Sequence, residues 1–80
     1  MDNVIKQDII DILTELRPEF DFSQEIDFYK EGMLDSFDIV ALVTVLEEKY
    51  KILIDALDFL PENFSSVEKI ESLIKKSGGK

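Results

Sequence analysis

The chain of 80 residues contains no cysteine, no histidine and no tryptophan. Without cysteine it can form neither a disulfide framework nor a thiolate-ligated metal site. Without histidine and cysteine it also lacks the commonest general base and the commonest thiol nucleophile. Calcium binding of the helix–loop–helix type is excluded as well, because no Asp-rich loop has the required ligand spacing. We therefore expect no catalytic residue and no metal site, and an enzyme is a disfavoured interpretation.

Positive charge is also scarce, because nine Lys and Arg residues face eighteen Asp and Glu residues, for a formal net charge of -9. Nucleic acids and anionic membranes bind proteins through Lys and Arg clusters, so neither is an expected partner. An acidic chain suits protein partners with basic patches instead. No apolar run approaches a bilayer span, and the N-terminus lacks the pattern of a signal peptide. We expect a monomer in the cytoplasm.

Three segments have apolar residues at the spacing of an amphipathic helix. They are residues 3–16, residues 36–50 and residues 66–76. Arg17 should end the first helix, because the residue before a proline is disfavoured in the helical region. A capping box of Ser65 and Glu68 should begin the last one. Asp55 should cap a short helix over residues 56–60, which Pro61 limits.

Residues 17–34 form a long connection that is rich in apolar side chains. These are Phe20, Phe22, Ile26, Phe28, Tyr29, Met33 and Leu34. A loop this long is uncommon in a compact domain unless it is functional or packed by its own side chains. We expect this loop to be packed across the helices. The prediction for residues 1–80 is one all-α domain with three longer helices, one short helix and a long first loop.

Asp35 and Ser36 stand together at the start of the second predicted helix, where only one of them can be the N-cap. If Asp35 is the cap, the Ser36 hydroxyl lies at the positive end of the helix dipole, which favours an anion attached there. Asp38 and Asp35 would oppose that anion, although they could hold a divalent cation or meet a basic modifying enzyme. Taken alone, an aspartate followed by a serine at a helix start is far more often a plain cap that has no further role.

The segment Gly32-Met33-Leu34-Asp35-Ser36-Phe37 resembles the Asp-Ser-Leu signature of the acyl and peptidyl carrier proteins, with Phe37 in place of the usual leucine. The resemblance extends from about residue 4 to residue 76. It implies a four-helix bundle whose third helix is short, and a phosphopantetheine arm on Ser36 that carries acyl or aminoacyl cargo as a thioester. It also implies three kinds of partner: a phosphopantetheinyl transferase, a loading ligase, and a downstream acyltransferase or synthase.

Residues 52–67 resemble the D-alanyl carrier branch of that family, in which an aromatic residue precedes the last helix. Phe59 and Phe64 are the aromatic residues of this segment. The branch implies a small aminoacyl cargo. Fatty acyl, polyketide and peptide cargoes remain open at this point.

Acidic residues are concentrated in one part of the chain, since residues 31–62 carry a net charge of -6 and residues 63–80 a net charge of +2. We expect Asp35, Asp38, Glu47 and Glu48 to dock on basic partner enzymes. Val40 and Leu42, on the second helix, are expected in the core rather than against the cargo. The competing hypothesis is a small acidic helical adaptor that binds a basic protein surface without carrying cargo, in which case Ser36 is incidental.

Overall fold

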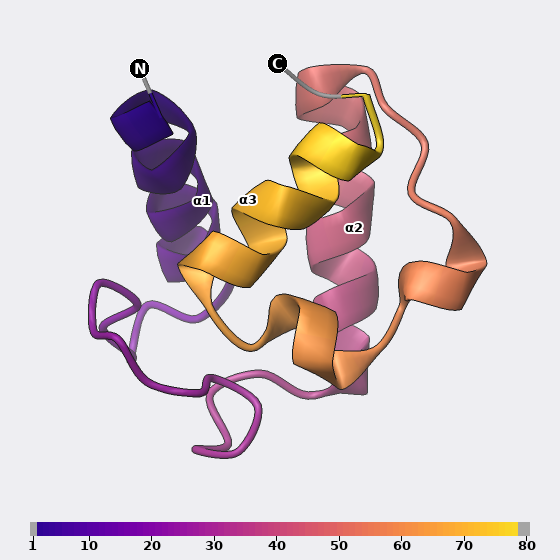
Figure 1. The fold of residues 1–80 in the computed structure, drawn as a ribbon. Helices are drawn as coiled ribbons and strands as arrows, with labels where there is room; N and C mark the ends of the chain where they lie inside the picture. Colours follow the sequence, from indigo (N-terminus) through magenta and orange to yellow (C-terminus); the bar gives the residue numbers. More distant parts are fainter. Residues whose placement is uncertain (1, 79–80) are drawn as a thin grey trace.

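The computed structural model describes residues 2–78 as three α-helices and two short 3-10 turns (Figure 1). In chain order these are α1 (Asp2–Leu16), α2 (Ser36–Tyr50), η1 (Ala56–Asp58), η2 (Pro61–Phe64) and α3 (Val67–Lys76). Within residues 2–78 there is no β-strand, and no helix there is long and apolar enough to cross a bilayer. The prediction of an all-α chain is confirmed, and each α-helix begins within one residue of its predicted start.

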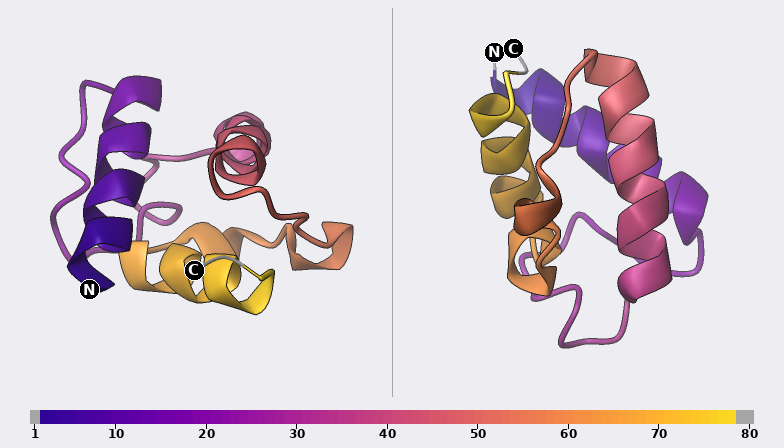
Figure 2. Two further views of the ribbon diagram at one scale, coloured as in Figure 1. Left: turned by 90° about the horizontal axis from the view of Figure 1, so that it is seen from above. Right: turned by 90° about the vertical axis from the view of Figure 1, so that its right-hand side faces the viewer.

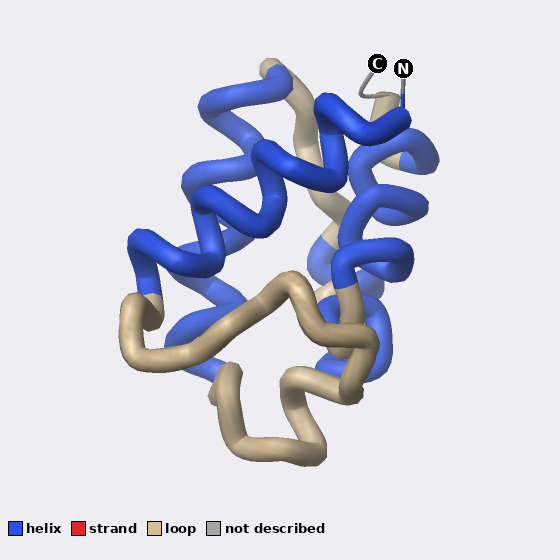
Figure 3. The backbone as a smooth tube through the Cα atoms, turned by 90° about the vertical axis from the view of Figure 1, so that its left-hand side faces the viewer, coloured by secondary structure: helices blue, strands red, loops and turns tan. Residues whose placement is uncertain are grey.

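The three α-helices pack around a common core, with α1 in contact with both α2 and α3. Viewed from above, α2 is seen end-on while α1 and α3 are inclined to it (Figure 2). The long loop leaves the end of α1, crosses toward η2 and returns to the start of α2 (Figure 3). The backbone N–H of Phe28 donates to the carbonyl of Ser65 at 2.8 Å, which joins the middle of this loop to the start of α3.

Side chains of the loop fill the core beside the helices. Phe22 and Phe28 are 1% and 0% exposed, and their rings meet edge to face at 5.1 Å between centroids. Met33 and Leu34 are buried as well. The prediction that apolar side chains pin this loop across the helices is confirmed. The rest of the core comes from the helical stripes and the segments beside them: Ile5, Ile9, Ile12, Leu13, Ile39, Leu42, Val43, Leu46, Ile52, Ile54, Phe64, Ile70, Leu73 and Ile74.

The loop ends in a tight turn that directs the chain into α2. Gly32 adopts a φ of +75°, a conformation that favours glycine, and its N–H donates to the carbonyl of Tyr29 at 3.1 Å. The next N–H, of Met33, donates to the carbonyl of Phe28 at 2.8 Å. The turn therefore buries Met33 shortly before Asp35 and Ser36.

The middle of α1 and the end of α2 are joined by a second polar contact. The Tyr50 hydroxyl donates to the Asp8 carboxylate at 3.1 Å, and the Lys49 ammonium lies 3.9 Å from the same oxygen. Burial, assisted by the Asp8 carboxylate, raises the pKa of Tyr50 to about 12. The hydroxyl therefore stays protonated, and remains a donor, throughout the physiological range.

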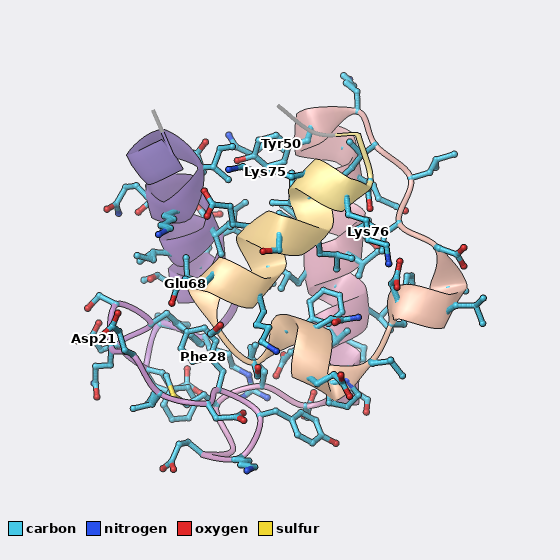
Figure 4. The ribbon with its side chains drawn as sticks, in the orientation of Figure 1. Asp21, Phe28, Tyr50, Glu68, Lys75 and Lys76 are labelled. Carbon is cyan, nitrogen blue, oxygen red and sulfur yellow. The ribbon has the colours of Figure 1, made fainter. Side chains whose placement is uncertain are left out.

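The chain departs from the predicted short helix over residues 56–60. Asp55 caps a turn as expected, but that turn is a 3-10 segment that ends at Asp58. Leu60 is extended, with ψ 138°, because it precedes Pro61, and the proline starts a second 3-10 turn. The four-helix bundle is therefore not confirmed. Lys76 points from α3 toward η1 (Figure 4), and its ammonium donates to the Asp58 carboxylate at 3.0 Å.

The predicted capping box of Ser65 and Glu68 is wrong by one residue. Ser66 is the N-cap of α3, and its hydroxyl accepts from the N–H of Lys69 at 3.2 Å. Ser65 closes η2 with φ -82° and ψ -14°, so its backbone cannot take the extended conformation of an N-cap. Its hydroxyl donates to the carbonyl of Glu62 instead.

Candidate functional site

Ser36 is the first residue of α2, and its side chain is exposed to solvent. Asp35 precedes it as the N-cap, with the extended backbone that this position requires (φ -119°, ψ -177°). The prediction that Asp35 rather than Ser36 caps the helix is confirmed. Among the described residues, the Ser36 hydroxyl has no hydrogen-bond partner, so it is free to react at the positive end of the helix dipole.

A reciprocal capping box fixes the backbone around Ser36. The N–H of Asp38 donates to the Asp35 carboxylate at 2.9 Å, and the N–H of Asp35 donates to the Asp38 carboxylate at 3.2 Å. Each carboxylate thus satisfies a backbone donor that the helix start leaves without an intrahelical partner. Ser36 lies inside this pair of hydrogen bonds, which hold its backbone in one conformation.

Arg17, the residue that follows α1, holds the capping box from outside. Its Nε and Nη2 atoms each lie 2.9 Å from Oδ2 of Asp38, and Nη2 also lies 3.4 Å from Oδ2 of Asp35. Its Nη1 atom lies 3.3 Å from the Glu19 carboxylate. Our sequence reasoning used Arg17 only as the end of a helix and missed this role. The available signal was that Arg17 is the single arginine of the chain.

These contacts favour the charged forms of the groups beside Ser36. Hydrogen bonding to Asp38 and the charge of that carboxylate raise the pKa of Arg17 above its ordinary value. The backbone N–H of Asp38, followed by the charge of Arg17, lowers the pKa of Asp35. The guanidinium thus lies where the sequence suggested a divalent cation. Within residues 2–78 no group of three or more acidic side chains is arranged to hold a metal ion.

The four predicted docking carboxylates do not form one exposed set. Asp38 is only 6% exposed and is bound by Arg17, so it links the end of α1 to the start of α2. Glu47 is half-buried, and its carboxylate accepts from the N–H of Ile54 at 2.9 Å. Asp35 and Glu48 are exposed. Two of the four predicted residues are therefore available to a partner.

An apolar surface that the sequence did not indicate lies beside Ser36. Phe37 is 80% exposed and Val40 is 55% exposed, whereas Leu42 is fully buried. The expectation of a core position is confirmed for Leu42 and wrong for Val40. Residues 37, 40, 44 and 48 are spaced by three or four, so they share one face of α2. The exposed apolar side chains of this face lead from Ser36 toward Glu48.

One of two surface hollows has a volume of about 430 Å³ and lies between α1, the long loop and the start of α3. Lys6, Phe22 and Val67 are among its lining residues. The other hollow lies between residues 53–58 and the end of α3. Neither of these two, among the residues described, is lined by α2.

Comparison with known proteins relates this chain to one group of small proteins. The D-alanyl carrier protein of Leuconostoc citreum is 32% identical over 76 residues, which cover 88% of this chain and 96% of that protein. The D-alanyl carrier protein of Bacillus subtilis is 35% identical over 57 residues, which cover 68% and 72% of the two chains. No family model matches the chain, and no solved structure matches it.

The lowered pKa of Asp35 predicts a pH-dependent contribution to stability. A carboxylate whose folded pKa is depressed stabilises the fold above its unfolded value of 3.8, and the contribution is lost as pH falls through the folded pKa. We expect a carbon-13 titration of the Asp35 carboxyl to have its midpoint below 3.8, and Arg17→Gln to move that midpoint upward. A midpoint at or above 3.8 in the unsubstituted protein would contradict the prediction.

Proposed function

This chain belongs to the family of D-alanyl carrier proteins, and we propose that it is a stand-alone carrier whose arm is attached to Ser36. The observation that carries the proposal is the exposed Ser36 hydroxyl at the first position of α2, held in place by the cap at Asp35. Phosphopantetheine, once bound, supplies a thiol that holds the cargo as a thioester. The chain itself contains neither cysteine nor histidine, which suits a carrier better than a catalyst.

The residues around Ser36 fit such an arm. Transfer joins Oγ of Ser36 to the pantetheine-side phosphorus of coenzyme A and breaks the pyrophosphate bond, so the adenosine nucleotide leaves. We expect the hydroxyl proton to pass to a base of the transferase, because this chain has no histidine and the carboxylates beside Ser36 are engaged by Arg17 and backbone N–H groups. The chain contributes an accessible hydroxyl on a fixed backbone. We also infer that η1 and η2 take the place of the short third helix of related carriers. The cytoplasmic location of the protein stays a prediction.

Attachment at Ser36 is tested by intact mass after incubation with coenzyme A and a phosphopantetheinyl transferase. We expect the mass to rise by one phosphopantetheine in the unsubstituted protein and to stay unchanged in Ser36→Ala. The Ala variant should fold normally, because Asp35 supplies the cap. Modification of the Ala variant would move the attachment elsewhere, and no modification of either form would favour the acidic adaptor.

For the cargo we propose a D-alanyl group, which is what the relatives are named for. The core of this chain is filled by its own side chains, and α2 lines neither of the two hollows described above. A small aminoacyl group gains little from burial, because its charged amine is costly to desolvate. A fatty chain would gain about 0.8 kcal/mol for each buried methylene, so it would call for a pocket.

The cargo proposal predicts how stability depends on acyl length. We expect the melting temperature of the carrier loaded with acyl groups of increasing length to stay flat, and an enzyme that activates D-alanine to charge it efficiently. A melting temperature that climbs steadily with chain length would indicate a sequestering pocket and a fatty acyl cargo. Failure of D-alanine charging together with a flat profile would point to a polyketide or peptide intermediate.

Partner enzymes, we further propose, dock on the face of α2 that carries Phe37, Val40 and Glu48. The exposed apolar side chains suit a desolvated contact, and the acidic residues at its two ends, Asp35 and Glu48, suit a basic rim on the loading ligase. Asp38 and Glu47 are left out of this surface because Asp38 is buried and Glu47 is half-buried, and both carboxylates are bound within the chain.

Charge reversal at Glu48 tests this surface. We expect Glu48→Lys to slow association with the loading ligase several-fold at low salt and to weaken its salt dependence, because rim charges act mainly on the association rate. The matched control is Glu68→Lys, which makes the same change in net charge at an exposed position in the first turn of α3 (Figure 4). Equal slowing by both variants would mean that only the overall charge matters.

A further inference from the structure

Arg17 makes two kinds of contact at the capping box. Its contacts to the buried Asp38 carboxylate are short, at 2.9 Å, while those to the exposed carboxylates of Asp35 and Glu19 are longer, at 3.4 Å and 3.3 Å. Ion pairs between exposed groups are weak, because solvent competes for both partners. The guanidinium is therefore anchored on one side by Asp38, and its contacts on the other side are easily exchanged.

An anion attached to Ser36 would enter a neighbourhood that already holds three carboxylates. A phosphodiester adds one more negative charge next to Asp35, and part of the compensation that the backbone amides of the helix start could offer is already used. The N–H of Asp38 already donates to the Asp35 side chain, and the N–H of Ile39 already donates to the carbonyl of Asp35. A cation is needed to offset the repulsion, and Arg17 is the one that contacts both carboxylates flanking Ser36.

We propose that Arg17 is the positioning residue for the arm, its guanidinium held by Asp38 and its outward N–H groups passing from Asp35 and Glu19 to the phosphodiester on Ser36. The inference rests on the attachment at Ser36 proposed above. The planar fork of arginine matches the oxygens of a phosphate, which a lysine ammonium would meet only as a point charge. Asp38 is buried, so it keeps the guanidinium in place while the outer contacts change.

The test compares the melting temperatures of the apo and arm-bearing forms in three backgrounds. In the unsubstituted protein we expect attachment to change the melting temperature little. In Arg17→Gln we expect attachment to lower it by roughly 4 °C more, the scale expected for a modest energetic loss in a domain of this size. Lys51→Gln removes one positive charge at the other end of the 15-residue α2, about 22 Å along the helix from Ser36. This variant should behave like the unsubstituted protein.

Two further readouts separate contact with the phosphate from a general structural role. Attachment should shift the guanidinium proton resonances of Arg17, and Arg17→Gln should shift the phosphorus-31 resonance of the arm while Lys51→Gln leaves it unchanged. A structural role alone would lower the melting temperature of apo and arm-bearing Arg17→Gln equally, and that result would overturn the proposal. Arg17→Lys keeps the charge, so it should restore part of the coupling, and it replaces the Gln variant if that variant does not fold.

The proposal can also be judged without the transferase. Ser36→Glu places an anion at the same position, and Ser36→Gln is its neutral counterpart. We expect Ser36→Glu to melt at a higher temperature relative to Ser36→Gln when position 17 is arginine than when it is lysine or glutamine. Equal differences in all backgrounds would overturn the role of Arg17. If Ser36 is not modified at all, the attachment proposal fails, and this comparison still decides whether Arg17 supports an anion there.

Discussion

The ion pair between Arg17 and Asp38 is the contact on which the rest of the site depends. It joins the end of α1 to the start of α2 across 21 positions of sequence and thereby closes the long loop. Asp38 in turn accepts from the N–H of Asp35, and Asp35 caps the helix on which Ser36 is the first residue. Removing one partner would leave a buried carboxylate uncompensated, which costs more than the intact pair contributes. The exposed serine is thus held by a series of contacts whose innermost member, Asp38, is buried.

The loop supplies the apolar volume that a short chain lacks. A domain of this size buries only about 60% of the surface that its unfolded chain exposes, so each large side chain matters. Phe22 and Phe28 are almost fully buried although they belong to no regular element, and each contributes about 1.5–3 kcal/mol by leaving water. The loop side chains pack into the core, and the outer face of α2 is left uncovered. Phe37 and Val40 are consequently free on that face.

The three α-helices and the cap at Asp35 were predictable because they depend on local patterns. Apolar spacing and the choice between two adjacent N-cap residues are determined by residues a few positions apart in the sequence. The exposure of Val40 was not predictable in this way, since it depends on which helix covers which face. The contact of Arg17 with Asp38 joins distant segments and has no local signature. The N-cap of α3 is Ser66 rather than Ser65 because Ser65 closes the 3-10 turn before it, in a backbone conformation that an N-cap does not adopt.

The carboxylates of α2 divide between two tasks, and burial decides which task each performs. Asp38 binds Arg17 and Glu47 binds the N–H of Ile54, so both carboxylates are already engaged within the fold. Asp35 and Glu48 are exposed at the two ends of the face that carries Phe37 and Val40. The formal net charge of -9 therefore does not describe what a partner meets on this face, because two of the four carboxylates are bound within the chain. The docking surface proposed above would present few charges around an apolar strip, which suits partners that must bind and release a carrier in turn.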